Sequence, residues 1–143
     1  MRRRVTSFSS KKGGPRAARA FLGVDVVEFN KARLFYVRHK NRLEKFFQKN
    51  EVAMIQKSHK PYESLAMLLA AKEAVFKSSS LPWMGADGFR KIQILSNRQN
   101  RLSFRLKGNF KKGFASRPAP LLSCLKGKDF VIAECRSVQC AGN

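Results

Sequence analysis

The feature that most constrains this chain is an unbroken helical stretch from Pro61 to Ser79, with the sequence PYESLAMLLAAKEAVFKSS. Its proline stands where the first turn of a helix accepts one, and the stretch contains no glycine. Ala and Leu, both good helix formers, dominate its middle. We therefore expect one long helix here, largely apolar, that packs against the rest of the fold.

An acidic residue interrupts an otherwise apolar segment near the N-terminus. Residues 20–27, AFLGVDVV, are rich in β-branched residues and predict a buried strand. Burying Asp25 within it is unfavourable unless the carboxylate is paired or holds a metal ion. Asp25 at a strand end that caps the next helix is the plainer alternative.

The remaining segments complete an α+β layout, with a small antiparallel sheet packed with the long helix. A turn over residues 96–100 predicts a hairpin between the first two of three β-like segments. We expect these segments to form a small meander, and residues 80–88, SLPWMGADG, to form a loop. The expected helices are Asn30–Phe47 and a short one near Glu51–Lys57, and the β-like segments are 89–96, 101–108 and 129–135.

Charge sets the class of partner. Thirty basic residues against nine acidic ones, in 143 residues, give a formal net charge of +21. Such a chain attracts polyanions, and by charge alone nucleic acid ranks first. We expect a single domain over residues 20–137, a basic and disordered tail over 1–19, and a C-terminal tail over 138–143. An organelle-targeting peptide is the alternative interpretation of the first tail.

Three cysteines and two histidines do not have the spacing of a zinc site. They favour a reduced, cytoplasmic protein, and no apolar run is long enough to span a membrane. On the long helix, Glu73 and Lys77 are one turn apart and share a face. Taken alone, this pair is a routine surface ion pair, and spacing alone does not link it to Asp25.

Two motifs together resemble a known family. GVDVVE at Gly23–Glu28 and AAKEAVFK at Ala70–Lys77 are similar to the two signatures of the holo-acyl-carrier-protein synthases. These are the small, single-lobed 4'-phosphopantetheinyl transferases, and the similarity covers roughly residues 20–135. The resemblance implies their fold and their reaction, in which phosphopantetheine moves from coenzyme A to a serine of an apo-acyl carrier protein, a transferase step associated with fatty acid biosynthesis.

The resemblance also implies roles for individual residues. Asp25 and Glu73 would bind Mg²⁺, which suits hard carboxylate oxygens and phosphates. Lys77 would stabilise the transferred phosphate, so that these three residues form the catalytic set. Lys72 would reach a coenzyme phosphate or remain solvated.

Partners follow from the same resemblance. The family docks acidic carrier proteins on basic residues of the first helix, and Lys31 and Arg38 match such positions; solvated surface cations are the equal alternative. A homotrimer with shared active sites is implied as well.

The sequence also departs from the family pattern. Leu68 stands where the family has arginine, and SSSLPWMG replaces a Gly-Thr-Gly turn near the coenzyme. Residues 99–101 replace a Gly-Lys-Pro hairpin turn, and Leu121–Ser123 replace a His-x-Ser/Thr segment. The member is therefore divergent. An inactive relative that binds an acidic carrier or nucleic acid stays open as an alternative, and an unrelated nucleic-acid-binding module ranks last because most Phe residues fall in core-like patterns.

Overall fold

The computed structural model describes residues 19–79, 81–114 and 117–139. Most of the expected basic tail, and residues 140–143 of the expected C-terminal tail, lie outside these ranges. The first and last strands extend to Arg19 and Gln139, so each begins or ends slightly beyond the predicted domain of residues 20–137.

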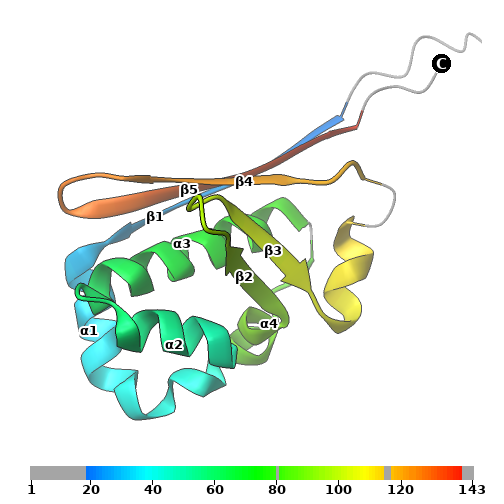
Figure 1. The fold of residues 1–143 in the computed structure, drawn as a ribbon. Helices are drawn as coiled ribbons and strands as arrows, with labels where there is room; N and C mark the ends of the chain where they lie inside the picture. The colour runs from blue at the N-terminus through cyan, green and yellow to red at the C-terminus, as the bar shows by residue number, and fades with distance from the viewer. Residues whose placement is uncertain (1–18, 80, 115–116, 140–143) are drawn as a thin grey trace, which may run out of the picture.

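Five strands, four α-helices and two 3₁₀ helices make up the described part (Figure 1). The strands are β1 (Arg19–Glu28), β2 (Ile92–Ser96), β3 (Leu102–Leu106), β4 (Leu121–Lys126) and β5 (Phe130–Gln139). The α-helices are α1 (Phe29–His39), α2 (Lys49–Lys57), α3 (Pro61–Ser79) and α4 (Gly85–Lys91). The 3₁₀ helices are η1 (Lys40–Lys45) and η2 (Gly108–Phe114).

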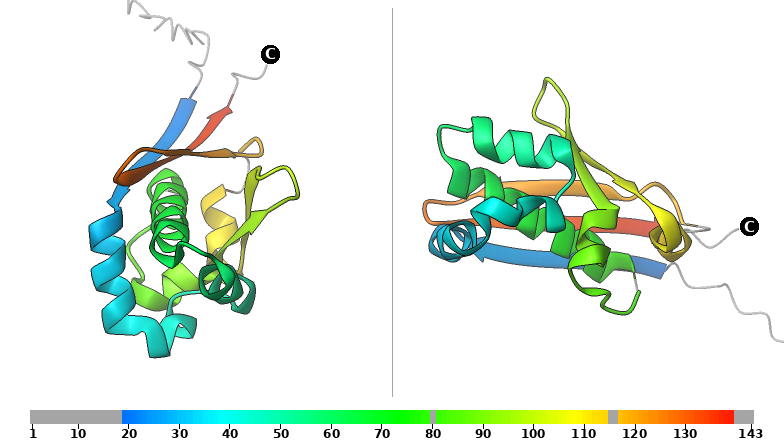
Figure 2. Two further views of the ribbon diagram at one scale, coloured as in Figure 1. Left: turned by 60° about the vertical axis from the view of Figure 1, so that its left-hand side comes forward. Right: turned by 90° about the horizontal axis from the view of Figure 1, so that it is seen from below.

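The strands form two separate antiparallel sheets. The larger one has the order β1-β5-β4, so the two ends of the described chain pair with each other, and β2 and β3 form a hairpin of their own. Helix α3 runs under the larger sheet, with α1, α2 and α4 on its other side (Figures 1 and 2). The α+β prediction, with a small antiparallel sheet packed on a long helix, is confirmed.

Alternation along the strands gives the larger sheet an inner and an outer face. Inward side chains of β5 at Val131, Ala133 and Cys135 are buried against α3. Helix α3 is itself buried over most of its circumference because it lies between this sheet and the other helices; its buried residues include Leu65, Ala66, Leu68, Ala70, Ala71, Ala74 and Val75.

Two local predictions were wrong. The helix expected over Asn30–Phe47 ends at His39, and the short η1 that follows contains a kink at Arg42, whose φ of −142° is not helical. The loop expected over residues 80–88 contains the start of α4. There the glycines are a misleading signal, because Asp87 and Lys91 form an i,i+4 ion pair of 2.8 Å that supports a helix.

The predicted meander is also wrong. The hairpin of β2 and β3 forms as expected, but the third segment, β5, pairs with β1 and β4 instead. Strand β4 was not anticipated. Its apolar residues lie on both faces, since Leu122 is buried while Leu121 and Leu125 are exposed, so it lacks the alternation of a half-buried strand.

Among the described residues, no helix has the length and hydropathy needed to cross a membrane.

Candidate active site

The site begins where β1 touches α3. A Cβ atom placed on Gly23 would lie 1.9 Å from the backbone oxygen of Ala74 and 2.6 Å from the amide nitrogen of Ser78. Only glycine allows the two backbones to approach this closely. Because side chains of a strand alternate, Asp25 projects to the same face as Gly23, toward α3.

Asp25 and Lys77 meet across this contact. The Lys77 ammonium donates a hydrogen bond of 2.7 Å to Oδ1 of Asp25 and one of 3.1 Å to the backbone oxygen of Val24. The Asp25 side chain is 18% exposed and that of Lys77 is 47% exposed. The buried acid expected from the sequence is therefore paired, and its partner is the predicted phosphate lysine.

Glu73 lies one turn before Lys77 and is half-buried. Burial raises the pKa of Glu73, the nearby negative charge of Asp25 raises it further, and the Lys77 ammonium partly opposes the shift. Asp25 and Glu73 thus interact electrostatically across the contact between β1 and α3. The structure thus brings Asp25, Glu73 and Lys77 together, although they are far apart in sequence.

These three side chains line one open depression of about 450 Å³. Strand β1, helix α3 and helix α1 supply most of its wall, and Phe89 of α4 supplies the rest. Within the described ranges, no cluster of three or more His, Cys, Asp and Glu residues has the arrangement of a metal site. Asp25 and Glu73 thus contribute two carboxylates to the wall of the depression.

The two expected docking residues occupy different places along α1. Lys31 lines the depression and pairs with Glu28 over 3.5 Å, both side chains being well exposed. Arg38 lies seven residues further on and is exposed. The structure therefore places both on the helix that forms one wall of the site.

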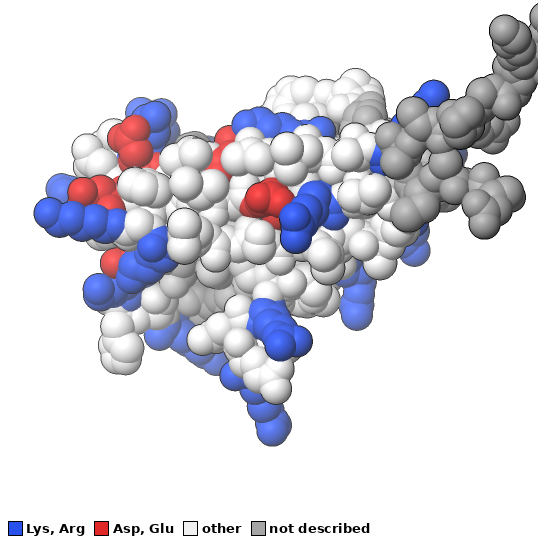
Figure 3. Space-filling model, turned by 90° about the horizontal axis from the view of Figure 1, so that it is seen from above, with Lys and Arg blue, Asp and Glu red and all other residues white. Residues whose placement is uncertain are grey.

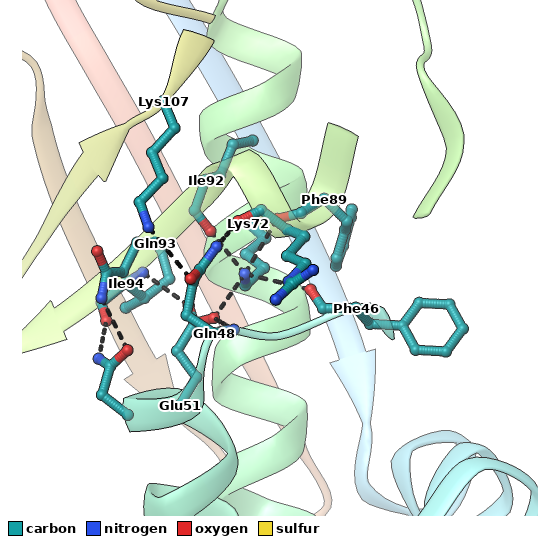
Figure 4. A network of polar contacts seen from close by, with 11 residues as sticks. Phe46, Gln48, Glu51, Lys72, Phe89, Ile92, Gln93, Ile94 and Lys107 are labelled. Atoms are coloured by element: carbon teal, nitrogen blue, oxygen red, sulfur yellow. Dashed lines mark hydrogen bonds and ion pairs between the residues drawn. The ribbon is translucent and has the colours of Figure 1, made fainter. Parts of the chain in front are cut away.

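Lys72 neither faces the depression nor is solvated, contrary to the two positions predicted for it. Its side chain is fully buried, on the inner side of α3, and neither reaches the depression nor contacts solvent (Figure 4). The ammonium lies 2.8 Å from Oε2 of Glu51 and donates hydrogen bonds to three backbone oxygens. The acceptors are Ile92 at 2.6 Å, Phe89 at 3.0 Å and Phe46 at 3.5 Å. The predicted contact with coenzyme is therefore replaced by a structural role.

Glu51 is the partner that sequence reasoning missed. Its carboxylate also accepts hydrogen bonds of 2.7 Å from the amides of Gln48 and Ile94, so both oxygens are satisfied without water. Burial lowers the pKa of Lys72 to about 8, and the charge of Glu51 offsets part of that shift. The ion pair joins the end of η1 with α2, α4 and β2 around α3 (Figure 4), and Lys72 immediately precedes Glu73 in the chain.

Several departures from the family pattern gather elsewhere. A second depression, of about 580 Å³, lies between the N-terminal part of α3, the tip of the β2–β3 hairpin and β4. Asn100, Arg101 and Leu121–Ser123 line it. Leu68, by contrast, is fully buried in the core, so an arginine there would need a different local packing.

Comparison with known proteins places the chain. The family model described as the 4'-phosphopantetheinyl transferase superfamily matches residues 21–135, and the chain belongs to this superfamily. A holo-[acyl-carrier-protein] synthase of Clostridium kluyveri is 33% identical over 90 residues, which cover 63% of this chain and 66% of that protein. The chain thus spans just under two thirds of that relative's length.

Solved structures agree on the fold. The holo-[acyl-carrier-protein] synthase of Neisseria meningitidis superposes with a TM-score of 0.71 at 23% identity, covering 81% of this chain and 95% of that one. The synthase of Chronobacterium ammoniagenes in complex with coenzyme A gives 0.68 at 26% identity, covering 83% and 96%. The family and the fold predicted from the two motifs are confirmed, and these relatives support the predicted enzyme class.

Proposed function

We propose that this chain is a holo-acyl-carrier-protein synthase that uses Mg²⁺ to transfer 4'-phosphopantetheine from coenzyme A to an apo-acyl carrier protein. The observation that carries the proposal is the convergence of Asp25, Glu73 and Lys77 on one depression. The family match and the holo-acyl-carrier-protein synthases among its relatives support the same activity. A coenzyme A complex of one structural relative supports the co-substrate.

The reaction is a substitution at phosphorus. The oxygen of the carrier serine forms a bond to the phosphorus that bears pantetheine, and that phosphorus loses its bond to the bridging oxygen of the pyrophosphate. Adenosine 3',5'-bisphosphate leaves, and the serine hydroxyl gives up its proton. Because such reactions require little covalent help from the protein, positioning and charge stabilisation are the tasks of the site.

Asp25 and Glu73 fit the metal that this chemistry uses. Mg²⁺ commonly takes one or two carboxylates and completes its shell with phosphates and water, which matches two acids in an open depression. When bound there, the ion would neutralise charge on the pyrophosphate. The pKa of Glu73 is raised first by burial and then by the charge of Asp25, and a cation bound between the two acids would oppose both effects.

Lys77 is the residue best placed to hold the transferred phosphate. Its ammonium lies at the wall of the depression, 47% exposed and anchored on Asp25 and the Val24 carbonyl. An ammonium in this position stabilises the negative charge of the phosphate oxygens.

The first helix supplies the docking surface for the carrier. Lys31 and Arg38 lie along α1, which borders the depression, so an acidic protein that binds there brings its serine to the site. Complementary charge of this kind mainly accelerates and orients association.

The outer face of the larger sheet favours the expected homotrimer. It carries exposed apolar side chains at Leu22, Val24, Val26, Leu121, Leu125, Phe130 and Val138. Figure 3 shows a largely uncharged surface on this side. Apart from the exposed Glu134–Arg136 ion pair, this face is largely apolar. An exposed apolar patch is typical of a subunit interface, and further copies of this chain are the occupants we propose.

Mass spectrometry of the carrier tests the activity. Purified protein, coenzyme A, Mg²⁺ and an apo-carrier should yield a carrier heavier by one phosphopantetheine group. Asp25→Asn and Glu73→Gln should abolish the product while circular dichroism shows a folded chain. Asp87→Asn, the same change at an exposed acid of α4, should retain it.

Two outcomes would overturn parts of the proposal. An unmodified carrier with the wild-type chain rejects the activity and favours the inactive binding protein. Product formation by either site variant rejects the metal assignment alone.

A further inference from the structure

The only tryptophan of the chain stands at the edge of the site. Trp83 follows the end of α3 and is 60% exposed. Its ring nevertheless has fixed neighbours, since it makes edge-to-face contacts with Phe76 at 5.3 Å and Phe89 at 6.0 Å between ring centroids. Phe76 precedes Lys77, and Phe89 lines the depression. An exposed indole is thus held against Phe89, which lines the depression.

Different elements of the fold lie at the two ends of the depression. Helix α1 adjoins the N-terminal half of α3, whereas residues 81–84, which include Trp83, follow its C-terminal end (Figure 1). That connection lies beside the open edge of β1 (Figure 2). Lys31 and Trp83 therefore lie toward opposite ends of one site.

The transfer reaction assigns a substrate to each end. In phosphoryl transfer, the attacking and leaving oxygens lie roughly in line on opposite sides of phosphorus. A carrier that docks on α1 brings its serine from that end, so the adenosine bisphosphate leaves toward the other end, where Trp83 stands. Adenine is the planar group of that leaving portion, and aromatic side chains bind bases by stacking.

We infer that Trp83 forms a stacking platform for the adenine of coenzyme A, in the segment where this chain lacks the family's Gly-Thr-Gly turn. The inference rests on the proposed function, because it uses the coenzyme as ligand and α1 as the carrier side. It gives the altered segment a role in coenzyme binding.

Intrinsic fluorescence tests the contact directly, because Trp83 is the sole tryptophan. The full chain is titrated with coenzyme A, adenosine 3',5'-bisphosphate and pantetheine. Saturable quenching by the first two, and none by pantetheine, is expected. Quenching by pantetheine alone, or by none of the three, overturns the inference. Because this binding assay requires no turnover, it can fail while the carrier is still modified.

Kinetics of three variants separates stacking from packing. Trp83→Ala should raise the KM for coenzyme A by about 5- to 140-fold, the loss expected for one base–aromatic stack. Trp83→Leu, which keeps an apolar side chain against Phe76 and Phe89, should raise it as much, and Trp83→Phe should restore most of it. Recovery with leucine, or a raised KM for the carrier instead of the coenzyme, overturns the assignment.

Discussion

The α-carbon of Gly23 lies against the backbone oxygen of Ala74, so that a methyl group on Gly23 would come within 1.9 Å of that oxygen. The obstacle is main chain, which no side-chain rearrangement relieves. This contact sets the separation of β1 and α3, and hence the separation of Asp25 from Glu73.

Gly23→Ala should therefore damage the site and the fold together. Overpacking a tight contact typically costs about 1–3 kcal/mol of unfolding free energy, and β1 must move away from α3 to accept the methyl group. We expect a lower melting temperature and loss of carrier modification. A variant with normal activity would contradict the view that this contact positions Asp25.

Glu73→Gln should abolish carrier modification and yet raise the melting temperature near neutral pH. A raised folded-state pKa means that the folded chain holds the proton of Glu73 more tightly than the unfolded chain does. The resulting destabilisation is absent below the unfolded-state pKa and grows as pH rises through the folded-state value. Without divalent cations, the variant should melt above wild type near about pH 7 and together with it near about pH 4.

Glu63→Gln is the matched control for that pH experiment. Glu63 lies on the same helix, but its pKa is lowered, chiefly by its hydrogen bond with Lys126. Removing its charge should thus lower the melting temperature at neutral pH. If both variants shift in the same direction, the interpretation of Glu73 fails.

Lys72→Met should be strongly destabilising because it leaves the Glu51 carboxylate buried without its cation. Breaking a buried pair in this way costs about 3–5 kcal/mol. The double variant Lys72→Met/Glu51→Gln should recover part of the loss, since it removes the unpaired buried charge, although glutamine keeps an acceptor for only one of the two backbone amides, Gln48 or Ile94. Urea denaturation of both singles and the double gives the coupling energy. Additive effects would contradict the pairing.

Arg38→Glu should weaken the interaction with the carrier and leave that with coenzyme unchanged. Exchanging attraction for repulsion at one exposed position should raise the KM for the carrier about two- to tenfold at low salt. The difference should shrink as salt screens the charges. Arg105→Glu makes the same change on exposed β3 and serves as control. Equal effects of both variants would mean that net charge, not α1, guides the carrier.

Leu125→Asp should disrupt subunit assembly. Leu125 is 68% exposed on the outer face of the sheet, on β4, away from Asp25. Light scattering after size exclusion should give a trimer for wild type and a single chain for the variant. Arg98→Asp, at the exposed hairpin tip, should leave the mass unchanged. A wild-type chain that is monomeric at all concentrations would reject the proposed interface.

The long helix, and through the two family motifs the grouping of Asp25, Glu73 and Lys77 at one depression, were predictable from the sequence, whereas the inward side of α3 was not. Asp25, Glu73 and Lys77 occur in two motifs whose spacing identifies the family. Lys72 is the immediate neighbour of Glu73, but α3 is apolar on nearly every side, so no hydrophobic stripe reveals which polar residue points inward.

Non-local pairing explains the other differences. Nothing in the polar segment of α2 indicates that Glu51 must meet a lysine on another helix. Strand β5 follows β4 closely, yet its second partner is β1, from the opposite end of the chain. Patterns in a single sequence describe local periodicity. Which distant segments pair with each other depends on tertiary packing, which such patterns do not contain.

The hydrogen bond from Lys77 to Asp25 bears on whether the chain needs a metal ion in order to fold. The acid already has a cation that is part of the chain, so no ion from outside is required for the polypeptide to reach its final shape. In chains whose metal supplies folding energy, a chelator unfolds the protein. Here a chelator should abolish carrier modification and leave the chain folded, and Mg²⁺ added afterwards should restore the activity.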